Sequence, residues 1–349
     1  MLEFGTCIVP HPTMEISLLI FEGSEKKADI YIDATKLSFL KDFDDDFWHN
    51  LVKQCGAKIL SSIENEHCKA FLLSESSLFV WHNRLLIITC GLTQLIKSVE
   101  FLLLHIDKQA LEQVIYQRKN EYFAPAQFTS FGEDIHQLEQ YCAGKAFRFG
   151  ALDTHHNYIF HSEHNSLKNL EKYKSSNNLA PNKTYEIVAY QICSDASEHL
   201  TTENLSNHNI RDYLQLTTLL PDFIFDDFVF EPYGYSINAI KGDDYFTIHV
   251  TPQADSSYVS FCSSLNLISM AAKILAILKP RSFDLLSINE NSFAEQVTNL
   301  LHSTQYLCQT SVAKQFSNKH QVNFTTYILP NLTTEEPIEL TTNSQNNTL

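Results

Sequence analysis

Glycine is scarce in this sequence, and its scarcity excludes two familiar ways of binding phosphate. Only 9 of the 349 residues are glycine, which is under half of the usual share of about 7%. Neither G-x-G-x-x-G nor G-x-x-x-x-G-K-[ST], the loops that cradle dinucleotides and nucleoside triphosphates, occurs in the chain. A protein of either of those two classes is therefore not expected.

Positive charge and long apolar runs are also in short supply. The chain has 25 lysines and arginines against 41 aspartates and glutamates, so its formal net charge is −16. A chain this acidic is a poor partner for nucleic acid or for an anionic membrane surface, although it tolerates cationic ligands. The longest apolar run, residues 85–96, is interrupted by Thr89, Gly91, Thr93 and Gln94 and is too short to span a bilayer. We therefore expect no nucleic-acid partner and no membrane partner.

The cysteines lack the spacing of a redox or zinc motif. No C-x-x-C pair occurs, which excludes a zinc knuckle and a thioredoxin-like site. In a chain of this length the cysteines are expected to be reduced and mostly buried. The first 14 residues have no basic segment followed by an apolar core, so no secretory signal is predicted and the cytoplasm is the expected compartment. The cysteines are Cys7, Cys55, Cys68, Cys90, Cys142, Cys193, Cys262 and Cys308.

The composition is that of a globular protein, and the order of its elements repeats. Hydrophobic residues make up 44% and charged residues 19%, at a length typical of roughly two domains. Alternation and helical spacing predict a hairpin at 77–90 and a helix at 92–106, then a hairpin at 235–250, a strand at 258–262 and a helix at 265–279. We therefore predict two related α/β halves.

The boundaries of the two halves follow from local composition. Residues 175–183 have the composition of a loop, so the halves are predicted as residues 20–174 and 175–332. Residues 1–19 form a predicted N-terminal extension. Residues 333–349, rich in threonine, asparagine and glutamate, are predicted to be a disordered tail.

The ends of the two predicted hairpins bring four reactive side chains into pairs. In an antiparallel hairpin, the start of the first strand lies beside the end of the second. Ser76 is therefore expected near Cys90, and Ser236 near His249. If the two halves pack about an approximate two-fold axis, all four side chains can converge on one site.

Two other kinds of site are weaker interpretations of the sequence. Residues 234–238 read G-x-S-x-N, one residue short of the G-x-S-x-G nucleophile elbow, and they precede a strand where the elbow needs a strand-to-helix turn. A cluster of possible metal ligands matches neither H-E-x-x-H nor H-x-x-E-H, so we predict a surface strand with several histidines instead. That cluster is His155, His156, His161, Glu163 and His164.

Seven short segments stand out when they are read in order along the chain. They are F-E-G-S-E-K (21–26), L-S-E-S-S-L-F-V (73–80), T-C-G (89–91), Y-Q-R-K-N (116–120), P-Y-G-Y-S-I-N (232–238), T-I-H-V-T-P (247–252) and S-Y-V-S-F (257–261). Each resembles the corresponding motif of the eukaryotic-type S-adenosylmethionine decarboxylase proenzymes. The resemblance covers nearly the whole chain, from about residue 20 to residue 327.

The resemblance implies a fold, a cofactor and a reaction. The implied fold is α+β: a four-layer αββα sandwich of two similar halves, each with a largely antiparallel sheet covered by helices. The implied proenzyme cuts itself between Glu75 and Ser76, and Ser76 becomes a pyruvoyl cofactor, with no metal and no pyridoxal phosphate. The pyruvoyl carbonyl binds the substrate amine as a Schiff base and takes up the electrons released with CO2. The implied substrate is S-adenosylmethionine, whose decarboxylated product donates aminopropyl groups in spermidine and spermine synthesis.

The resemblance also implies roles for individual residues. Ser236 and His249 would assist self-cleavage, since a hydroxyl can stabilise an oxyanion and an imidazole can take a proton near neutral pH. Cys90 would return a proton to the substrate carbon as general acid. Phe21 and Phe230 correspond to the aromatic residues that stack on adenine. The corresponding site carboxylates are Glu22, Glu25 and Glu75.

Several positions depart from the family pattern. Gln253 stands where the family usually has a glutamate that holds the ribose hydroxyls, and its amide can still bond a diol without the charge. Cys262 and Ile88 replace an acid and a lysine of the putrescine-activation site of the mammalian-type enzymes, which leaves Asp29 and Glu163 there. Losing such charges weakens a site for a dication. We therefore predict no strong activation by putrescine.

Two alternatives remain beside the S-adenosylmethionine decarboxylase. Gln253 is compatible with a pyruvoyl decarboxylase of the same fold that acts on another amino acid. A non-catalytic regulatory paralogue is the other alternative, but such a subunit should have lost the processing serine or its helpers. All four of those residues, Ser76, Cys90, Ser236 and His249, are present. Relatives occur as monomers and as dimers, so a homodimer of cleaved heterodimers is compatible with the sequence.

Overall fold

The computed structural model describes residues 22–162, 182–201, 205–231, 234–253, 257–302, 304–316 and 320–330. The predicted extension, the predicted tail and nearly all of the predicted join between the halves lie outside these ranges. Within them, no helix is long and apolar enough to cross a membrane.

Eight strands form the first sheet, and each neighbouring pair in it is antiparallel. Their order in space is β2-β3-β4-β5-β1-β6-β8-β7. The strands are β1 (Lys26–Ile32), β2 (Ile59–Glu64), β3 (Cys68–Leu73), β4 (Ser76–Trp81), β5 (Arg84–Thr89), β6 (Leu111–Lys119), β7 (Gly144–Phe149) and β8 (Asn157–Ser162).

The second sheet repeats the first, strand for strand. Its order is β10-β11-β12-β13-β9-β14-β16-β15, so each strand takes the place of the strand numbered eight lower. Its pairs are also antiparallel. The strands are β9 (Thr184–Tyr190), β10 (Ile224–Val229), β11 (Tyr235–Lys241), β12 (Asp244–Thr251), β13 (Tyr258–Ser263), β14 (Ser282–Ile288), β15 (Leu307–Gln315) and β16 (Gln321–Ile328). The expected α+β fold of two similar halves is confirmed.

The repeat changes how the two predicted hairpins correspond. The first predicted hairpin is β4–β5, and its counterpart in the second sheet is β12–β13. The second predicted hairpin is β11–β12, which corresponds to β3–β4. The two predicted hairpins therefore do not correspond to each other but differ by one strand. The additional predicted strand at 258–262 is β13, the counterpart of β5. Ser76 and Ser236 consequently do not occupy equivalent positions in the two halves.

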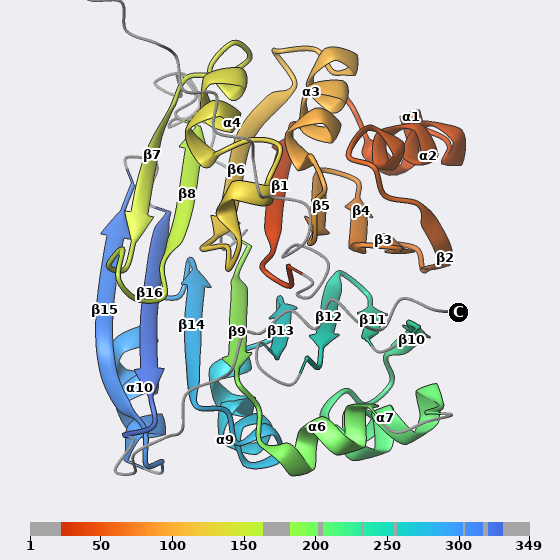
Figure 1. Ribbon diagram of the computed structural model, residues 1–349. Helices are drawn as coiled ribbons and strands as arrows, with labels where there is room; N and C mark the ends of the chain where they lie inside the picture. Colours follow the sequence, from red (N-terminus) through yellow and green to blue (C-terminus); the bar gives the residue numbers. More distant parts are fainter. Residues whose placement is uncertain are drawn as a thin grey trace, which may run out of the picture.

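Helices cover the outer face of each sheet, which completes the four layers (Figure 1). The first sheet carries α1 (Phe39–Asp42), α2 (Asp45–Gln54), α3 (Leu95–His105), the 3-10 turn η2 (Ala124–Ala126) and α4 (Phe131–Leu138). The second half carries α6 (Ser194–Thr201), α7 (Asn207–Tyr213), α8 (Leu216–Leu219), α9 (Leu267–Leu278) and α10 (Phe293–Leu301). In each half one long helix, α3 or α9, follows the fifth strand.

Local sequence explains where these helices begin and end. The Asp44 side chain accepts a hydrogen bond from the Phe47 backbone N–H, which caps the start of α2. Helix α3 begins three residues later than its apolar spacing predicts, because the Thr93 hydroxyl donates to the Cys90 carbonyl and closes a turn first. Helix α9 ends at Leu278, because the next residue, Lys279, is left-handed with φ 42° and precedes Pro280.

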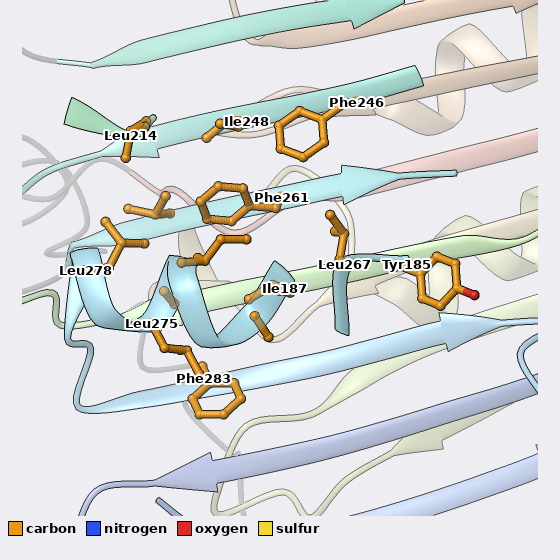
Figure 2. Close-up of a cluster of buried hydrophobic side chains, with 14 of the residues drawn as sticks. Tyr185, Ile187, Leu214, Phe246, Ile248, Phe261, Leu267, Leu275, Leu278 and Phe283 are labelled. Carbon is orange, nitrogen blue, oxygen red and sulfur yellow. The ribbon is translucent and has the colours of Figure 1, made fainter. Parts of the chain in front are cut away.

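Apolar cores lie on both faces of each sheet. Figure 2 shows part of the core between the second sheet and its helices, where Leu275 and Leu278 of α9 pack among Ile187, Phe261 and Phe283 of the strands. Burying one such side chain contributes roughly 1.5–3 kcal/mol. Smaller apolar clusters join the two sheets to each other, and one of them includes Phe79 of β4 and Tyr245 of β12. The sheets are therefore held face to face.

Polar side chains also lie between the sheets, among them a histidine that the sequence placed on the surface. His161 of β8 is 1% exposed and stacks on Phe316 at 4.2 Å. The prediction of a surface strand was wrong, because β8 lies inside the first sheet and one face of it meets the second sheet. Glu163 and His164 lie outside the described residues, and no group of three or more potential metal ligands occurs within them.

Candidate active site

The predicted cleavage position lies in a tight turn between β3 and β4. Ser74 and Glu75 form the turn, and Ser76 begins β4 with 2% of its surface exposed. The backbone of Ser76 has φ 144°, a conformation that residues with a side chain rarely adopt. Strain of this kind costs of the order of 1–3 kcal/mol and persists only where the surrounding structure enforces it. The Glu75–Ser76 peptide is therefore held in a conformation of raised energy.

Cys90 holds the carbonyl oxygen of that peptide with two donors. Ser76 pairs with Thr89 across β4 and β5. Glu75, just before Ser76, and Cys90, just after Thr89, are therefore neighbours. The Glu75 carbonyl accepts from the Cys90 backbone N–H at 3.0 Å and from its Sγ at 3.3 Å. Donors at these positions can stabilise negative charge on that oxygen. The sequence predicted that Cys90 lies beside Ser76, but not that the backbone of Cys90 contacts this carbonyl.

The surroundings of Cys90 favour the protonated form of its thiol. Burial, reinforced by the nearby Glu75 and Glu25 carboxylates, raises the pKa of Cys90 well above its usual value. A thiol in this state can donate a proton at neutral pH. The ammonium group of Lys26 lies close by and donates to the Gly91 carbonyl at 2.9 Å. Burial lowers the pKa of Lys26, an effect to which the charge of Arg118 adds.

His249 reaches Ser76 from the second sheet. Its Nε2 lies 3.1 Å from Ser76 Oγ and 2.9 Å from Ser77 Oγ, and its side chain is buried. Ser236 is the partner of His249 in the register of β11 and β12, as predicted. The four residues grouped by the sequence thus lie at one place between the sheets.

A carboxylate fixes the other side of the His249 ring. Glu25 Oε1 lies 2.7 Å from His249 Nδ1 and also accepts from the Ser260 hydroxyl. Burial alone would raise the pKa of Glu25, but the Lys27 ammonium and the His249 ring together lower it to about 2. Glu25 is therefore ionised at neutral pH and fixes both the orientation of the ring and the position of its Nδ1 proton.

The sequence analysis missed Lys27, which is the cation at the centre of this arrangement. Lys27 Nζ lies 2.9 Å from Glu25 Oε2 and 3.0 Å from Glu186 Oε2 of the second sheet, and all three side chains are buried. In the register, Lys27 stands directly opposite Ile88, the position at which the family pattern has a lysine. The signal was the lysine pair at residues 26–27, which begins a strand whose remaining residues are apolar or aromatic except for Asp29.

Glu22 holds two loops together beside the cleavage turn. Its carboxylate accepts from the backbone N–H groups of Ser24 at 3.0 Å and of Phe123 at 2.9 Å. Its carbonyl accepts from the Gly91 N–H at 2.8 Å. Gly23 allows this close approach, because a Cβ at this position would lie only 3.0 Å from the Cβ of Tyr258 and one of the two would have to shift. These contacts fit a role for Glu22 in positioning the turn.

The predicted adenine-binding residues are described in part. Phe21 lies outside the described residues. Phe230 is half-buried, and its ring lies 4.9 Å from the ring of Phe228 in a T-shaped arrangement. Phe228 is opposite Ser236 in the register of β10 and β11, and Ser236 is opposite His249 in the register of β11 and β12. The aromatic pair therefore lies beside the strand pair that contains His249. Gln253 is half-buried and follows the end of β12 by two residues.

Comparison with known proteins gives consistent matches. The family model for adenosylmethionine decarboxylase matches residues 19–328. An S-adenosylmethionine decarboxylase proenzyme of Leishmania donovani is 30% identical over 284 residues, which cover 76% of this chain and 72% of that protein. The corresponding proenzyme of Daucus carota is 29% identical and covers 93% of this chain and 94% of its own length. A crystal structure of the Trypanosoma brucei AdoMetDC-delta26 monomer is 21% identical, with a TM-score of 0.54, and covers 73% of this chain and 99% of that one.

The fold and these matches define a class, the carboxy-lyases built on two stacked antiparallel sheets. More particularly, this chain belongs to the adenosylmethionine decarboxylase family.

Proposed function

We propose that this protein is a self-processing decarboxylase that converts S-adenosylmethionine to its decarboxylated form, with a pyruvoyl group made from its own Ser76. The observation that carries the proposal is the placement of Ser76 Oγ. It lies on the strained Glu75–Ser76 peptide, 3.1 Å from His249 Nε2, while Cys90 donates to the adjoining carbonyl. The nucleophile and the oxyanion donors of an acyl shift, and the base for the elimination that follows it, are thus close together.

The first stage of self-processing transfers an acyl group within the chain. Ser76 Oγ attacks the Glu75 carbonyl carbon and gives up its hydroxyl proton. The Cys90 N–H and thiol stabilise the oxyanion. The C–N bond then breaks and the proton passes to the amine of Ser76, which leaves Glu75 attached as an ester. Release of the backbone strain at Ser76 favours this direction.

The second stage removes that ester. Loss of the Ser76 Cα proton to His249 and cleavage of the Cβ–O bond release Glu75 as the carboxylate end of the small chain. The resulting dehydroalanine tautomerises to an imine, and water replaces its nitrogen, which leaves as ammonia. The large chain then begins with a pyruvoyl group. The residues around Ser76 fit such a group, because they are buried and offer it hydrogen-bond donors.

When present, the pyruvoyl carbonyl supplies an electron sink for loss of CO2 from an amino acid. The thiol of Cys90 stays protonated and is placed to return a proton to the substrate carbon. Phe230 offers an aromatic face for an adenine ring, and the acidic surroundings tolerate a sulfonium cation. The amide of Gln253 is proposed to bond the ribose hydroxyls.

Two measurements test this function. Purified protein should run as two chains on a denaturing gel, and the mass of the larger chain should match a pyruvoyl N-terminus, whereas Ser76→Ala should stay in one piece. The processed protein should release CO2 from carboxyl-labelled S-adenosylmethionine and not from ornithine or arginine. A wild-type chain that stays intact after long incubation would refute self-processing. A cut chain that prefers ornithine or arginine would refute the substrate.

Lys27 also bears on the proposed partners. Its ammonium group pairs with Glu25 and Glu186 between the sheets, where a bound dication would have to compete with it. We therefore propose that putrescine is not needed for activity.

The free cysteines of the described residues are compatible with the cytoplasm. Three of these seven are buried, so the expectation that most would be buried was wrong.

A further inference from the structure

Lys26 is a buried cation beside the cleavage turn that the mechanism above does not use. Five lysine and arginine side chains are buried in the part of the chain that the structure describes, and all five belong to the first sheet. Four of them form an ion pair with a carboxylate, namely Lys27, Arg84, Arg118 and Lys119. Lys26 is 2% exposed and forms no such pair among the described residues. Its ammonium group donates instead to a neutral acceptor, the Gly91 carbonyl.

The acids around Lys26 do not compensate its charge. The Glu22 carboxylate accepts from two backbone N–H groups, and Glu121 pairs with Arg118. Burial raises the pKa of the Glu75 side chain and so favours its neutral form, although the charge of Lys26 opposes this. Burial and the charge of Arg118 in turn lower the pKa of Lys26. In the uncut chain, a buried ammonium group is therefore held without a counter-ion, which is costly.

Self-cleavage creates the missing negative charge close by. Elimination breaks the Cβ–O bond of Ser76, so the carboxylate left on Glu75 contains the present carbonyl oxygen and the oxygen of Ser76. The ammonia that is released takes up the matching proton and leaves as ammonium. The site is thus left with one more negative charge than it had before the cut.

The short segment from Thr89 to Gly91 brings this charge and Lys26 together. Lys26 is opposite Thr89 in the register of β1 and β5, and its Nζ lies 2.9 Å from the Gly91 carbonyl oxygen. Between these two residues, the Cys90 backbone N–H donates to the Glu75 carbonyl at 3.0 Å. The ammonium group and the oxygen that becomes part of the new carboxylate are therefore held by neighbouring peptides of one segment.

We propose that Lys26 is the counter-ion of the C-terminal carboxylate that self-cleavage leaves on Glu75, and that it holds this end of the small chain beside Cys90. The proposal rests on the proposed self-processing. Lys26 is thus a positioning residue whose charge is balanced only after the cut. The carboxylate that it retains adds a negative charge next to the Cys90 thiol, which favours the protonated thiol that the decarboxylation needs.

The test measures the pKa of the new carboxyl group in the processed protein. Glutamate labelled with carbon-13 at its α-carboxyl carbon enters every glutamate position, but only at Glu75 does that carbon become a titrating carboxyl group. An α-carboxyl group ordinarily has a pKa of about 3.5, which burial without a counter-ion would raise. In the wild type, the signal should remain that of a carboxylate down to about pH 4. In Lys26→Met, the pKa should rise by about one unit or more.

The matched control is Lys58→Met. Lys58 is bonded through its backbone to Ser74 of the cleavage turn, but its side chain is exposed. Loss of this exposed charge should leave the pKa of the new carboxyl group unchanged, because solvent screens it.

Two results would overturn the proposal. One is a wild-type carboxyl group that titrates above about pH 4.5, and this result stands even if Lys26→Met does not fold or process. The other is a pKa that is the same in Lys26→Met as in the wild type. Failure of the wild type to cleave would instead overturn the proposed function.

Discussion

Replacing Lys27 tests the buried charges between the sheets most directly. Lys27→Met, made in a Ser76→Ala background so that the chain stays in one piece, removes the ammonium group that pairs with Glu25 and Glu186. Methionine keeps an unbranched side chain, so charge is lost with little change of packing. Removing one partner of a buried pair typically costs about 3–5 kcal/mol, because the remaining charge has no compensation.

The pKa of Glu25 independently indicates how large this loss of stability should be and how it should change with pH. It is about 2 in the folded protein against an ordinary 4.5, a difference worth roughly 3 kcal/mol. Because the folded pKa is the lower one, this stability is present above pH 4.5 and is lost as the pH falls toward 2. Lys27 is the largest cause of the lowering. Without it the pKa of Glu25 should rise toward its ordinary value.

The assay is urea unfolding followed by circular dichroism, at several pH values between about 3 and 7. Lys27→Met should lose roughly 3 kcal/mol near neutral pH, and the difference from its parent should shrink in acid. The control, Lys69→Met, breaks pairs with the exposed Asp45 and Glu64 and should cost less than about 1 kcal/mol. Equal losses for the two variants, or a loss at Lys27 that does not change with pH, would refute the reasoning.

Four further predictions concern the chemistry. His249→Ala should stall at the ester, so that hydroxylamine cuts the chain at residue 76, and an ester that still resolves at the wild-type rate would rule out His249 as the base. Cys90→Ala keeps its backbone N–H and should still process slowly, but CO2 release from the processed chain should fall about 100-fold or more. Because the pKa of Cys90 is raised well above its ordinary value, kcat should stay level up to about pH 9, and a decline from about pH 8 would contradict this. Putrescine should change the rate of CO2 release less than twofold, and several-fold activation would overturn the role given to Lys27.

The sequence predicted contacts made within one hairpin better than contacts made between the sheets. Ser236 and His249 face each other because strand register depends on local alternation and turn position, which can be read from the residues. The contact between Ser76 and His249 joins residues 173 positions apart. It depends on how the two sheets pack, so it was predicted only by assuming a two-fold axis between the halves or from the family resemblance.

Buried polar residues were hardest to predict, because a charged or polar residue in a strand suggests a solvent-facing side chain. Lys27 and His161 both lie between the sheets, where partners from distant segments compensate for burial. Glu186, the partner of Lys27, lies far from it in the sequence, so alternation within β1 gave no sign of the pair. The same limit applies to the buried Asn238, whose side-chain partners are on β3 and β4.

The strand order of the first sheet affects how the protein unfolds and refolds after self-cleavage. A break between β3 and β4 gives a small fragment that contains β1, and β1 lies between β5 and β6 of the large fragment. The fragments can then separate only if the sheet itself comes apart. Once unfolded, they have to find each other again, so recovery becomes second order in concentration. The intact chain folds as one molecule, whereas the processed protein, once denatured, should regain its structure poorly in dilute solution.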